Sequence, residues 1–354
     1  MHDVIVIGGG QSGLAAARAA VERGLAPVVL EASPEPTGSW PRYYDSLTLF
    51  SPAGYSGRPD AAFPGDPERY PTRDEVAAHL RDCAARLDVE IRTNTRVTAV
   101  TTDDHGVFAV HTEAGDTLPA AGVVAASGSF DNPHRPVFPG QDGFTGEILH
   151  VADYRNPKPY TGQRIVVVGG GNSAVQVGYE LAEVAEVTLA TRQPLAFMPQ
   201  RHDGQDLHYW LRHTGFDDLP PEWLARLVST TLVLDTGEYR HALDTGRLDR
   251  RPMFTAFDGD SIVWADGTRE AVDTVLLATG YRPHLDYLEP LGAVVEGMPQ
   301  HTGGISTTHL GLVYVGLEFQ RSFASNTLRG VHRDAEYVMA ALAAHVRGAG
   351  RLTP

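Results

Sequence analysis

The sequence predicts an α/β protein with two similar domains, one inserted into the other, and three observations support this class. The chain has 354 residues, which suits about two domains of roughly 150 residues each. Residues 4–16 (VIVIGGGQSGLAA) and residues 165–177 (IVVVGGGNSAVQV) repeat one pattern of four apolar residues, three glycines and a helix-like segment. Since an unbroken apolar run is typical of a strand buried on both faces, each copy predicts a strand of a parallel sheet followed by a helix.

The amino-acid composition argues against several kinds of binding partner and excludes several kinds of cysteine site. Acidic residues outnumber basic ones by 44 to 29, for a net charge of −15, which disfavours nucleic acids and anionic membranes. Cys83 is the only cysteine, so an internal disulfide, a CxxC redox pair and a Cys-rich zinc site are excluded. The sequence shows no signal-like segment and no apolar stretch of about 18 residues, so we expect a cytoplasmic protein.

The first glycine loop has the spacing of a Rossmann-like dinucleotide-binding site. Gly8, Gly10 and Gly13 form a G-x-G-x-x-G pattern between a predicted strand and a predicted helix, whose N–H groups and dipole suit a pyrophosphate. Glu31 ends the next apolar run, 23 residues after Gly8, where a carboxylate accepts hydrogen bonds from ribose hydroxyls and repels a 2′-phosphate. We therefore expect a dinucleotide with a free ribose, such as FAD, at this loop.

The second loop repeats the pattern with one informative difference. It reads Gly169-x-Gly171-x-x-Ala174, and Ala in the third position is an accepted variant. At the same offset of 23 residues stands Arg192 in place of an acid, and a guanidinium can pair bidentately with a phosphate. We therefore expect NADPH in preference to NADH, although a plain solvated residue at a strand end is the alternative for Arg192. Two such domains predict a flavoprotein that takes hydride from a nicotinamide.

Apolar runs and turn residues predict the remaining elements in order. We expect a helix over 72–87, a Pro-rich linker over 131–140, and a terminal helix over 327–346 capped by Ser325 or Asn326. Predicted strands cover residues 89–91, 97–100, 107–112, 123–126, 187–191, 262–264, 272–278 and 312–315. The elements group into two three-layer, Rossmann-like domains. The FAD-binding domain is expected at residues 1–155 and 281–354, and the inserted NADPH-binding domain at residues 156–280.

The segment between the two domains carries the pattern F-x-G-x-x-x-H-x-x-x-Y, which is formed by Phe144, Gly146, His150 and Tyr154. In this pattern the chain resembles the flavin-containing monooxygenases, a family of class B flavoprotein monooxygenases. Three further segments share the resemblance: residues 37–40 (TGSW), 277–281 (LATGY) and 312–317 (LVYVGL). The likeness covers nearly the whole chain and is strongest to a short bacterial branch whose members carry loose labels of metal or arsenic resistance.

The resemblance implies an enzyme that uses NADPH and dioxygen. One oxygen atom would pass from a C4a-(hydro)peroxyflavin to a soft nucleophile, the sulfur or nitrogen atom of a small molecule. The residues implied to bind FAD are Gly8, Gly10, Gln11, Ser12, Gly13, Glu31, Ala32, Ser39, Trp40, Val97, Ser127, Gly128, Gly316 and Leu317. Those implied to bind NADPH are Gly169, Gly171, Asn172, Ser173, Ala174, Arg192, Thr279, Gly280 and Tyr281. His150 and Tyr154 would support the domain junction rather than transfer protons.

The chain departs from the family at a position beside the flavin. Many members have an Asn in a stretch like S-L-x-T-N, where this chain has Phe50, which can donate no hydrogen bond from its side chain. The candidates for that work are Ser51, Gln320 and Asn326, and no catalytic residue is assigned. Two alternatives therefore stay open. One is an NADPH-dependent flavoprotein reductase or oxidase without oxygen insertion, and the other is a flavin-binding sensor or regulator of transport or metal resistance.

The histidines give one weaker signal. His202, His208 and His213 fit no standard metal-ligand spacing, so we expect no metal site. The segment His208-Tyr209-Trp210 predicts either core packing or a wall of the substrate pocket. A small molecule and dioxygen are the expected partners, and the sequence is compatible with a homodimer.

Overall fold

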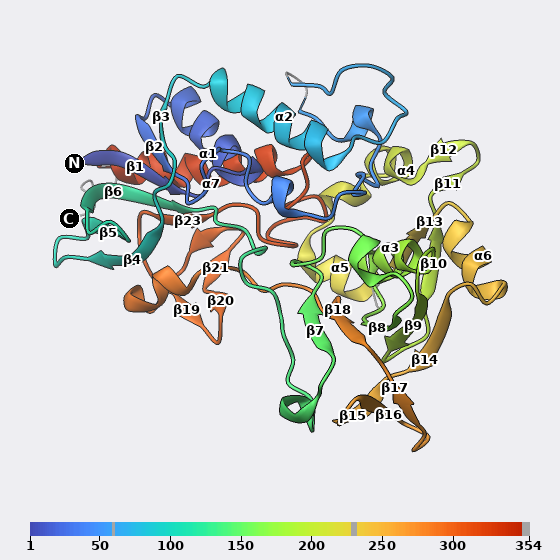
Figure 1. Cartoon of the computed structure of the whole chain (residues 1–354). Helices are drawn as coiled ribbons and strands as arrows, with labels where there is room; N and C mark the ends of the chain where they lie inside the picture. Colours follow the sequence, from blue (N-terminus) through green and yellow to red (C-terminus); the bar gives the residue numbers. More distant parts are fainter. Residues whose placement is uncertain (59–60, 228–231, 349–354) are drawn as a thin grey trace.

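Two large sheets organise the chain, and each is covered on both faces (Figure 1). The computed structural model describes residues 1–58, 61–227 and 232–348. The last six residues of the predicted range 281–354 therefore lie outside the described residues. The predicted α/β class, with two Rossmann-like units, is confirmed. In the described ranges, no helix is long and apolar enough to cross a membrane.

The first sheet has a parallel centre that begins with the N-terminal strand. Its strand order is β21-β22-β23-β6-β1-β2-β3, and β4 and β5 extend it as an antiparallel pair alongside β6. Residues Val4 to Ile7 of β1 are buried from both sides, as an unbroken apolar run requires in a parallel sheet. The strands are β1 (His2–Ile7), β2 (Pro27–Leu30), β3 (Glu90–Arg92), β4 (Val97–Thr102), β5 (Phe108–Thr112), β6 (Thr117–Ala125), β21 (His301–Thr302), β22 (Ile305–Ser306) and β23 (Leu312–Tyr314).

Helices α1 (Gln11–Glu22) and α7 (Val331–Val346) cover one face of this sheet and pack against each other (Figure 1). The other face is covered by the β4–β5 pair and the 3-10 helix η6 (Asp286–Leu291). Helix α2 (Arg73–Ala85) packs outside, near the short helix η1 (Trp40–Arg42). A capping box between Thr72 and Glu75 starts α2.

The second sheet is parallel throughout, with strand order β14-β9-β8-β18-β7. Its strands are β7 (Glu147–His150), β8 (Arg164–Val168), β9 (Glu186–Thr191), β14 (Asp249–Pro252) and β18 (Thr274–Leu277). Helices α3 (Asn172–Leu181) and α6 (Glu238–Asp244) cover one face. A small antiparallel sheet of β15 (Phe254–Asp258), β16 (Ser261–Trp264) and β17 (Arg269–Ala271) covers the other. The edge strand β7 comes from the range 1–155, which otherwise builds the first sheet.

A less regular segment of the inserted region reaches toward the first unit. Figure 1 shows its helix α4 and hairpin β11–β12 beside the chain that follows η1. This segment consists of β10 (Ala196–Pro199), β11 (Arg201–His202), β12 (Gln205–Asp206), α4 (Leu207–His213), η5 (Phe216–Asp218), α5 (Pro221–Leu227) and β13 (Leu232–Asp235). The remaining short elements are η2 (Ala53–Tyr55), η3 (Gln141–Gly143), η4 (Lys158–Tyr160), β19 (Val294–Val295) and β20 (Met298–Pro299).

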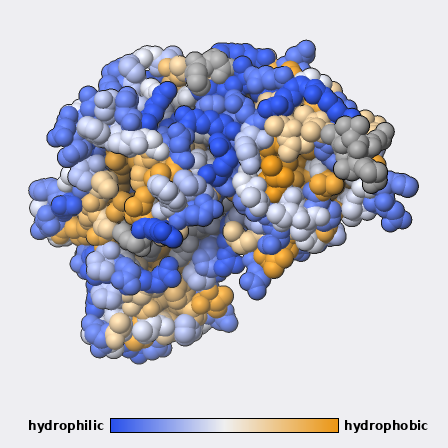
Figure 2. All heavy atoms as spheres, turned by 180° about the vertical axis from the view of Figure 1, so that it is seen from behind, coloured by the Kyte–Doolittle hydropathy of each residue, from blue (hydrophilic) through white to orange (hydrophobic). Residues whose placement is uncertain are grey.

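One local expectation differs from the structure, and several strands were not predicted at all. Helix α7 begins at Val331 with Gly330 as its N-cap, so the expected start at Thr327 and the expected caps Ser325 and Asn326 are wrong. Strand β14 was not predicted, because its sequence DRRP lacks an apolar pattern and its residues are at most half-buried. Viewed from behind, the surface is mostly hydrophilic with separate apolar patches, as is usual for a folded protein (Figure 2).

Candidate active site

The first glycine loop makes a tight turn that brings β1 and α1 close together. Gly8 has a φ of +105°, and a Cβ atom there would lie 2.5 Å from the carbonyl oxygen of Ala126. A Cβ atom on Gly13 would lie 1.8 Å from the carbonyl oxygen of Gly8, so only glycine allows this helix to approach its strand. The first N–H groups of α1, which have no partner within the helix, therefore lie at the strand end. They form an anion-binding cradle of the kind that holds a pyrophosphate.

Glu31 lies beside this cradle at the end of β2. Its side chain is 6% exposed, and its Oε2 accepts a hydrogen bond from the backbone N–H of Gly9 at 2.6 Å. Its Oε1 accepts from the backbone N–H of Ser33 at 2.7 Å. Each carboxylate oxygen retains a second acceptor site for a hydroxyl group. The cradle and this fixed acid fit the pyrophosphate and ribose of a dinucleotide.

A cavity of about 440 Å³ opens from the cradle along the strand ends of the first sheet. Twelve of the fourteen residues predicted for FAD line it: Gly8, Gly10, Gln11, Ser12, Glu31, Ala32, Ser39, Trp40, Val97, Ser127, Gly128 and Gly316. Gly13 and Leu317 do not line it, and Gly13 acts in the strand–helix packing described above. Gln11 forms hydrogen bonds with two segments that line the cavity. Its Oε1 accepts from Trp40 Nε1 at 3.2 Å, and its Nε2 donates to the carbonyl oxygen of Asn326 at 2.7 Å.

The three polar candidates, Ser51, Gln320 and Asn326, differ in their position relative to the cavity. Ser51 and Asn326 line the cavity. Gln320 does not line it: its Oε1 accepts from the N–H of Leu317 at 3.3 Å, and the residue is only 3% exposed. Sequence reasoning missed several other lining residues, which lie outside the motifs used for the prediction: Arg42, Tyr43, Phe130, Tyr287 and Arg329.

The second glycine loop has the same tight turn with different chemistry around it. A Cβ atom on Gly169, whose φ is +144°, would lie 2.4 Å from the carbonyl oxygen of Ala278. Asn172 begins α3, and its Oδ1 accepts from the N–H of Leu234 at 2.9 Å, which leaves its NH₂ group to face a ligand. Ser173 follows it and is half-buried in the first turn of the helix, and Ala174 is buried beneath the loop.

Arg192 follows β9 at the place that corresponds to Glu31. Its side chain is exposed and forms no hydrogen bond or ion pair with the described part of the chain. A free guanidinium at this strand end can pair with a phosphate. After β18, which is separated from β9 by β8, Thr279 Oγ1 donates to the carbonyl oxygen of His134. Tyr281, one residue after Gly280, stacks on Phe130 of the first cavity at 5.3 Å and 21°.

The residues of the F-x-G-x-x-x-H-x-x-x-Y pattern contact the second unit. Phe144 packs on Phe257 at 4.7 Å between ring centroids. A Cβ atom on Gly146 would lie 2.5 Å from the carbonyl oxygen of Asp273. Tyr154 OH donates to Glu180 Oε2 of α3 at 3.0 Å.

His150 ends β7 and is fully buried, with its ring edge against Tyr281 at 5.1 Å. Its Nδ1 accepts from the N–H of Ala152 at 3.1 Å, so the proton of the neutral ring lies on Nε2. Burial, aided by Arg135, lowers the pKa of His150 to about 4. His150 is therefore neutral at physiological pH.

The irregular segment joins the two units beside the cavity. Phe50, whose side chain is 45% exposed, lines the cavity, and its carbonyl oxygen accepts from Gln200 Nε2 at 2.8 Å. Further along, Arg329, which also lines the cavity, forms a bidentate pair with Asp217 at 2.7 and 2.8 Å. Both partners of that pair are nearly buried, at 10% and 6% exposure of their side chains.

The structure also places the histidine-rich segment. His208 is 2% exposed and stacks on Phe50, while Tyr209 and Trp210 are half-buried on α4. His202 is exposed on the hairpin, and His213 Nδ1 contacts the carbonyl oxygen of Tyr209. His208 therefore packs directly behind a residue of the cavity wall.

The chain is similar in sequence and in fold to known oxidoreductases. Residues 5–218 match the pyridine nucleotide-disulphide oxidoreductase family. The chain is 31% identical over 342 residues to an uncharacterized CzcO-like oxidoreductase of Geobacillus kaustophilus, covering 95% of this chain and 97% of that protein. It is 29% identical over 313 residues to the indole-3-pyruvate monooxygenase YUCCA1 of Oryza sativa subsp. japonica, covering 79% and 77%. A solved flavin-containing monooxygenase from Stenotrophomonas maltophilia matches with a TM-score of 0.84 at 31% identity, covering 98% of this chain and 99% of that one.

Proposed function

The chain belongs to the flavin-containing monooxygenases, within the pyridine nucleotide-disulphide oxidoreductase family, and its cofactors are FAD and NADPH. From this family membership and the geometry of the two glycine loops, we propose a reaction and a site for each cofactor. We propose that it transfers one atom of dioxygen to a sulfur or nitrogen atom of a small molecule. When bound, the flavin accepts hydride from NADPH and activates dioxygen. Since Cys83 is the only cysteine, the dithiol chemistry in the name of the broader family is not available to this chain.

The FAD site in this proposal is the cavity at the strand ends of the first sheet. The N–H groups at the start of α1 hold the pyrophosphate, and Glu31 accepts hydrogen bonds from the ribose. Trp40, fixed by Gln11, lies on the cavity wall and helps to exclude water. The domain that binds FAD comprises residues 1–155 and 281–354, except that β7 completes the neighbouring sheet.

The NADPH site lies at the second glycine loop, in residues 156–280. The charge difference between Glu31 and Arg192 at equivalent strand ends carries the proposal. A buried, twice-bonded carboxylate repels a 2′-phosphate, whereas an exposed guanidinium without a partner in the described chain attracts one. The NH₂ group of Asn172 and the N–H groups that begin α3 hold the pyrophosphate. The two loops would thus hold different nucleotides, FAD at the first and NADPH at the second.

The substrate site is the part of the cavity lined by aromatic rings, which include Trp40, Tyr43, Phe50 and Tyr55. Aromatic walls favour a substrate with an apolar body. Arg42 also lines the cavity, but its charge is balanced by an ion pair with Asp131, and its guanidinium lies over the ring of Phe130. These features support a thioether or amine of small size rather than an anionic substrate.

One observation favours a second candidate, a reductase or oxidase that releases hydrogen peroxide without inserting oxygen. Phe50 lines the cavity with nearly half of its side chain exposed and offers no hydrogen bond from that side chain. Ser51 Oγ, the adjacent polar group, is paired with Ser56 Oγ at 2.8 Å. Of the three polar candidates, Asn326 thus lines the cavity with a side chain that forms no hydrogen bond with the described residues.

Isotopically labelled dioxygen separates the two candidates. The purified, FAD-loaded protein is incubated with NADPH, labelled dioxygen and a panel of small thioethers and amines, and products are analysed by mass spectrometry. Incorporation of one labelled atom per NADPH consumed supports the monooxygenase. Hydrogen peroxide in an amount equal to the NADPH consumed, with no label in any organic product, would support the oxidase instead.

A further inference from the structure

We propose that His208, oriented by Asp206, is a positioning residue that holds Phe50 in the wall of the cofactor cavity. The inference rests on the proposed function, since it concerns how that cavity is closed. It assigns a role to a segment of the inserted region that follows no cofactor motif.

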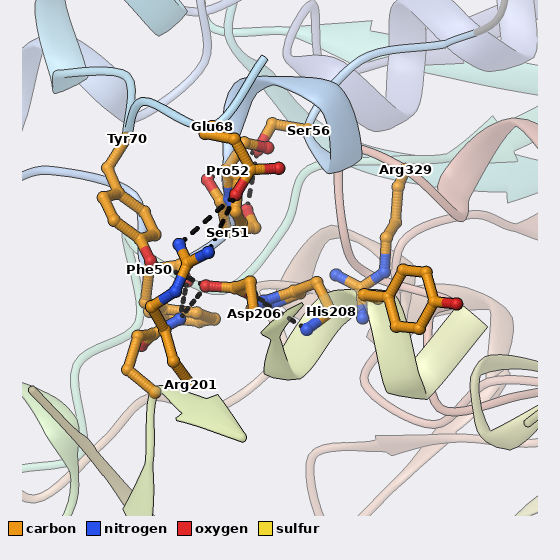
Figure 3. Close-up of polar contacts among 12 residues, drawn as sticks. Phe50, Ser51, Pro52, Ser56, Glu68, Tyr70, Arg201, Asp206, His208 and Arg329 are labelled. Atoms are coloured by element: carbon orange, nitrogen blue, oxygen red, sulfur yellow. Dashed lines mark hydrogen bonds and ion pairs between the residues drawn. The ribbon is translucent and has the colours of Figure 1, made fainter. Parts of the chain in front are cut away.

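Asp206 makes more hydrogen bonds than a helix cap requires. It is 1% exposed, and its Oδ1 accepts from the backbone N–H of His208 at 2.8 Å, which is the capping bond of α4. The same oxygen contacts His208 Nδ1 at 2.7 Å, while Oδ2 accepts from Tyr70 OH at 2.6 Å and from Gln200 Nε2 at 2.7 Å (Figure 3). Three side chains thus converge on one buried carboxylate.

These bonds keep the carboxylate charged and fix the imidazole. Burial opposes the charge, but hydrogen bonds from His208, Tyr70 and Gln200 outweigh it and lower the pKa of Asp206. Burial, together with the nearby carboxylate, raises the pKa of Tyr70 to about 12, so its hydroxyl remains a donor. Because a carboxylate only accepts, Nδ1 of His208 carries a proton, and the ring can adopt a single orientation.

The fixed imidazole lies against Phe50. The two rings stack at 6.0 Å between centroids and 27° between planes, within the range of favourable offset stacking. Gln200, which donates to Asp206, also donates to the carbonyl oxygen of Phe50 at 2.8 Å. The inserted segment therefore holds Phe50 at two points, its main chain and its ring. Phe50 in turn lines the cavity, whereas His208 does not.

The consequence is that one wall of the cavity depends on a residue of the other unit. In the view of Figure 3, Asp206 and His208 lie between Phe50 and Arg329, which both line the cavity and both form hydrogen bonds with this segment. If the imidazole is removed, the Phe50 ring gains rotational freedom and water gains access to the cavity. NADPH, a proton and dioxygen then yield NADP⁺ and hydrogen peroxide, in place of NADP⁺, water and an oxygenated substrate.

Three substitutions at one position separate the two contacts of His208. H208A removes both contacts, H208N keeps a donor near Asp206 but loses the ring, and H208F keeps the ring but loses the donor. We expect the hydrogen peroxide formed per NADPH to rise about threefold to tenfold in H208A and H208N, because the ring contact is lost. H208F should stay near the wild-type ratio. H202A is the matched control, since His202 is a mostly exposed histidine of the β11–β12 hairpin that precedes α4.

Two further readouts make the proposal refutable. Hydrogen exchange of the backbone over residues 46–56, measured on the FAD-loaded protein without NADPH, should accelerate in H208A and H208N but not in H208F or H202A. In a double-mutant cycle, H208A should add nothing to F50A, because His208 acts through Phe50. Additive effects, or exchange that is equal in all variants, would overturn the proposal. If wild type oxygenates no substrate, the proposed function fails, while the exchange experiment still decides the positioning role.

Discussion

Replacing Arg192 with Ala tests the assignment of the second nucleotide site directly. The guanidinium follows β9, is exposed, and has no partner within the described residues. Its removal therefore breaks no contact that holds the described fold, and any effect on activity comes from the ligand. We expect NADPH to be used less well by the variant, while NADH, which lacks the 2′-phosphate, is used as before.

The magnitude follows from the exposure of the side chain. A hydrogen bond to a charged group contributes about 1.5–3 kcal/mol, and exposure to solvent places Arg192 at the lower end. About 1.5 kcal/mol corresponds to about a tenfold loss in kcat/KM for NADPH. The value for NADH should remain within about twofold. Because salt screens exposed charges, the difference between wild type and variant should shrink at high ionic strength.

The assay compares initial rates with both nucleotides at low and high salt. Arg269→Ala is the control, because Arg269 is also exposed but lies on β17, paired with Asp258 at 2.9 Å. This control should leave both nucleotides unaffected. An equal loss for NADPH and NADH, or no loss for either, would refute the assignment of Arg192 to the 2′-phosphate.

Three other predictions concern the first site and the stability of the fold. Glu31→Gln removes the charge from a carboxylate that accepts hydrogen bonds from two backbone N–H groups. The Kd for FAD, measured by flavin fluorescence, should therefore rise about tenfold. An unchanged Kd would contradict the assignment of Glu31 to the ribose. Asp217→Ala leaves the nearly buried Arg329 without its ion-pair partner, so the free energy of unfolding by denaturant should fall by about 3–5 kcal/mol. An unchanged midpoint of the denaturant unfolding curve would show that the pair contributes nothing to stability. Burial lowers the pKa of His150 from 6.5 to about 4 in the folded protein. Between pH 6.5 and pH 4, this histidine is therefore protonated in the unfolded chain but neutral in the folded chain. The free energy of unfolding should therefore decrease from pH 6.5 toward pH 4, and this decrease should be smaller in His150→Gln; equal pH profiles would argue against a buried neutral ring.

The local chemistry of both loops could be predicted because it is contiguous in the sequence. Strand, glycines and helix start follow one another, and Glu31 and Arg192 stand at a fixed offset from their loops. Each of these features depends on one βαβ unit, whose geometry is nearly invariant. The sequence therefore indicated residues that line the cavity beside the first glycine loop, apart from Gly13 and Leu317, which do not line it.

The far wall of the cavity could not be predicted, since it depends on how distant segments pack. Asp217 and Arg329 are 112 residues apart, and Gln200 and Phe50 are 150 residues apart. Nothing in either segment specifies its partner. The sequence also did not indicate that the amide of the candidate Gln320 accepts a hydrogen bond from the N–H of Leu317 and does not line the cavity.

The pairing of β7 with β18 has a consequence for dissecting the molecule into parts. A fragment of residues 156–280 would lack β7, and β18 would become an edge with unpaired N–H and C=O groups. Such an exposed parallel edge recruits strands from other chains and leads to aggregation. A fragment that starts before Phe138 would keep this edge closed and retain Phe138 and Phe144, which pack on the outer layer of the second sheet. The family pattern around His150 thus belongs physically to the inserted fold, although it precedes the insertion in the chain.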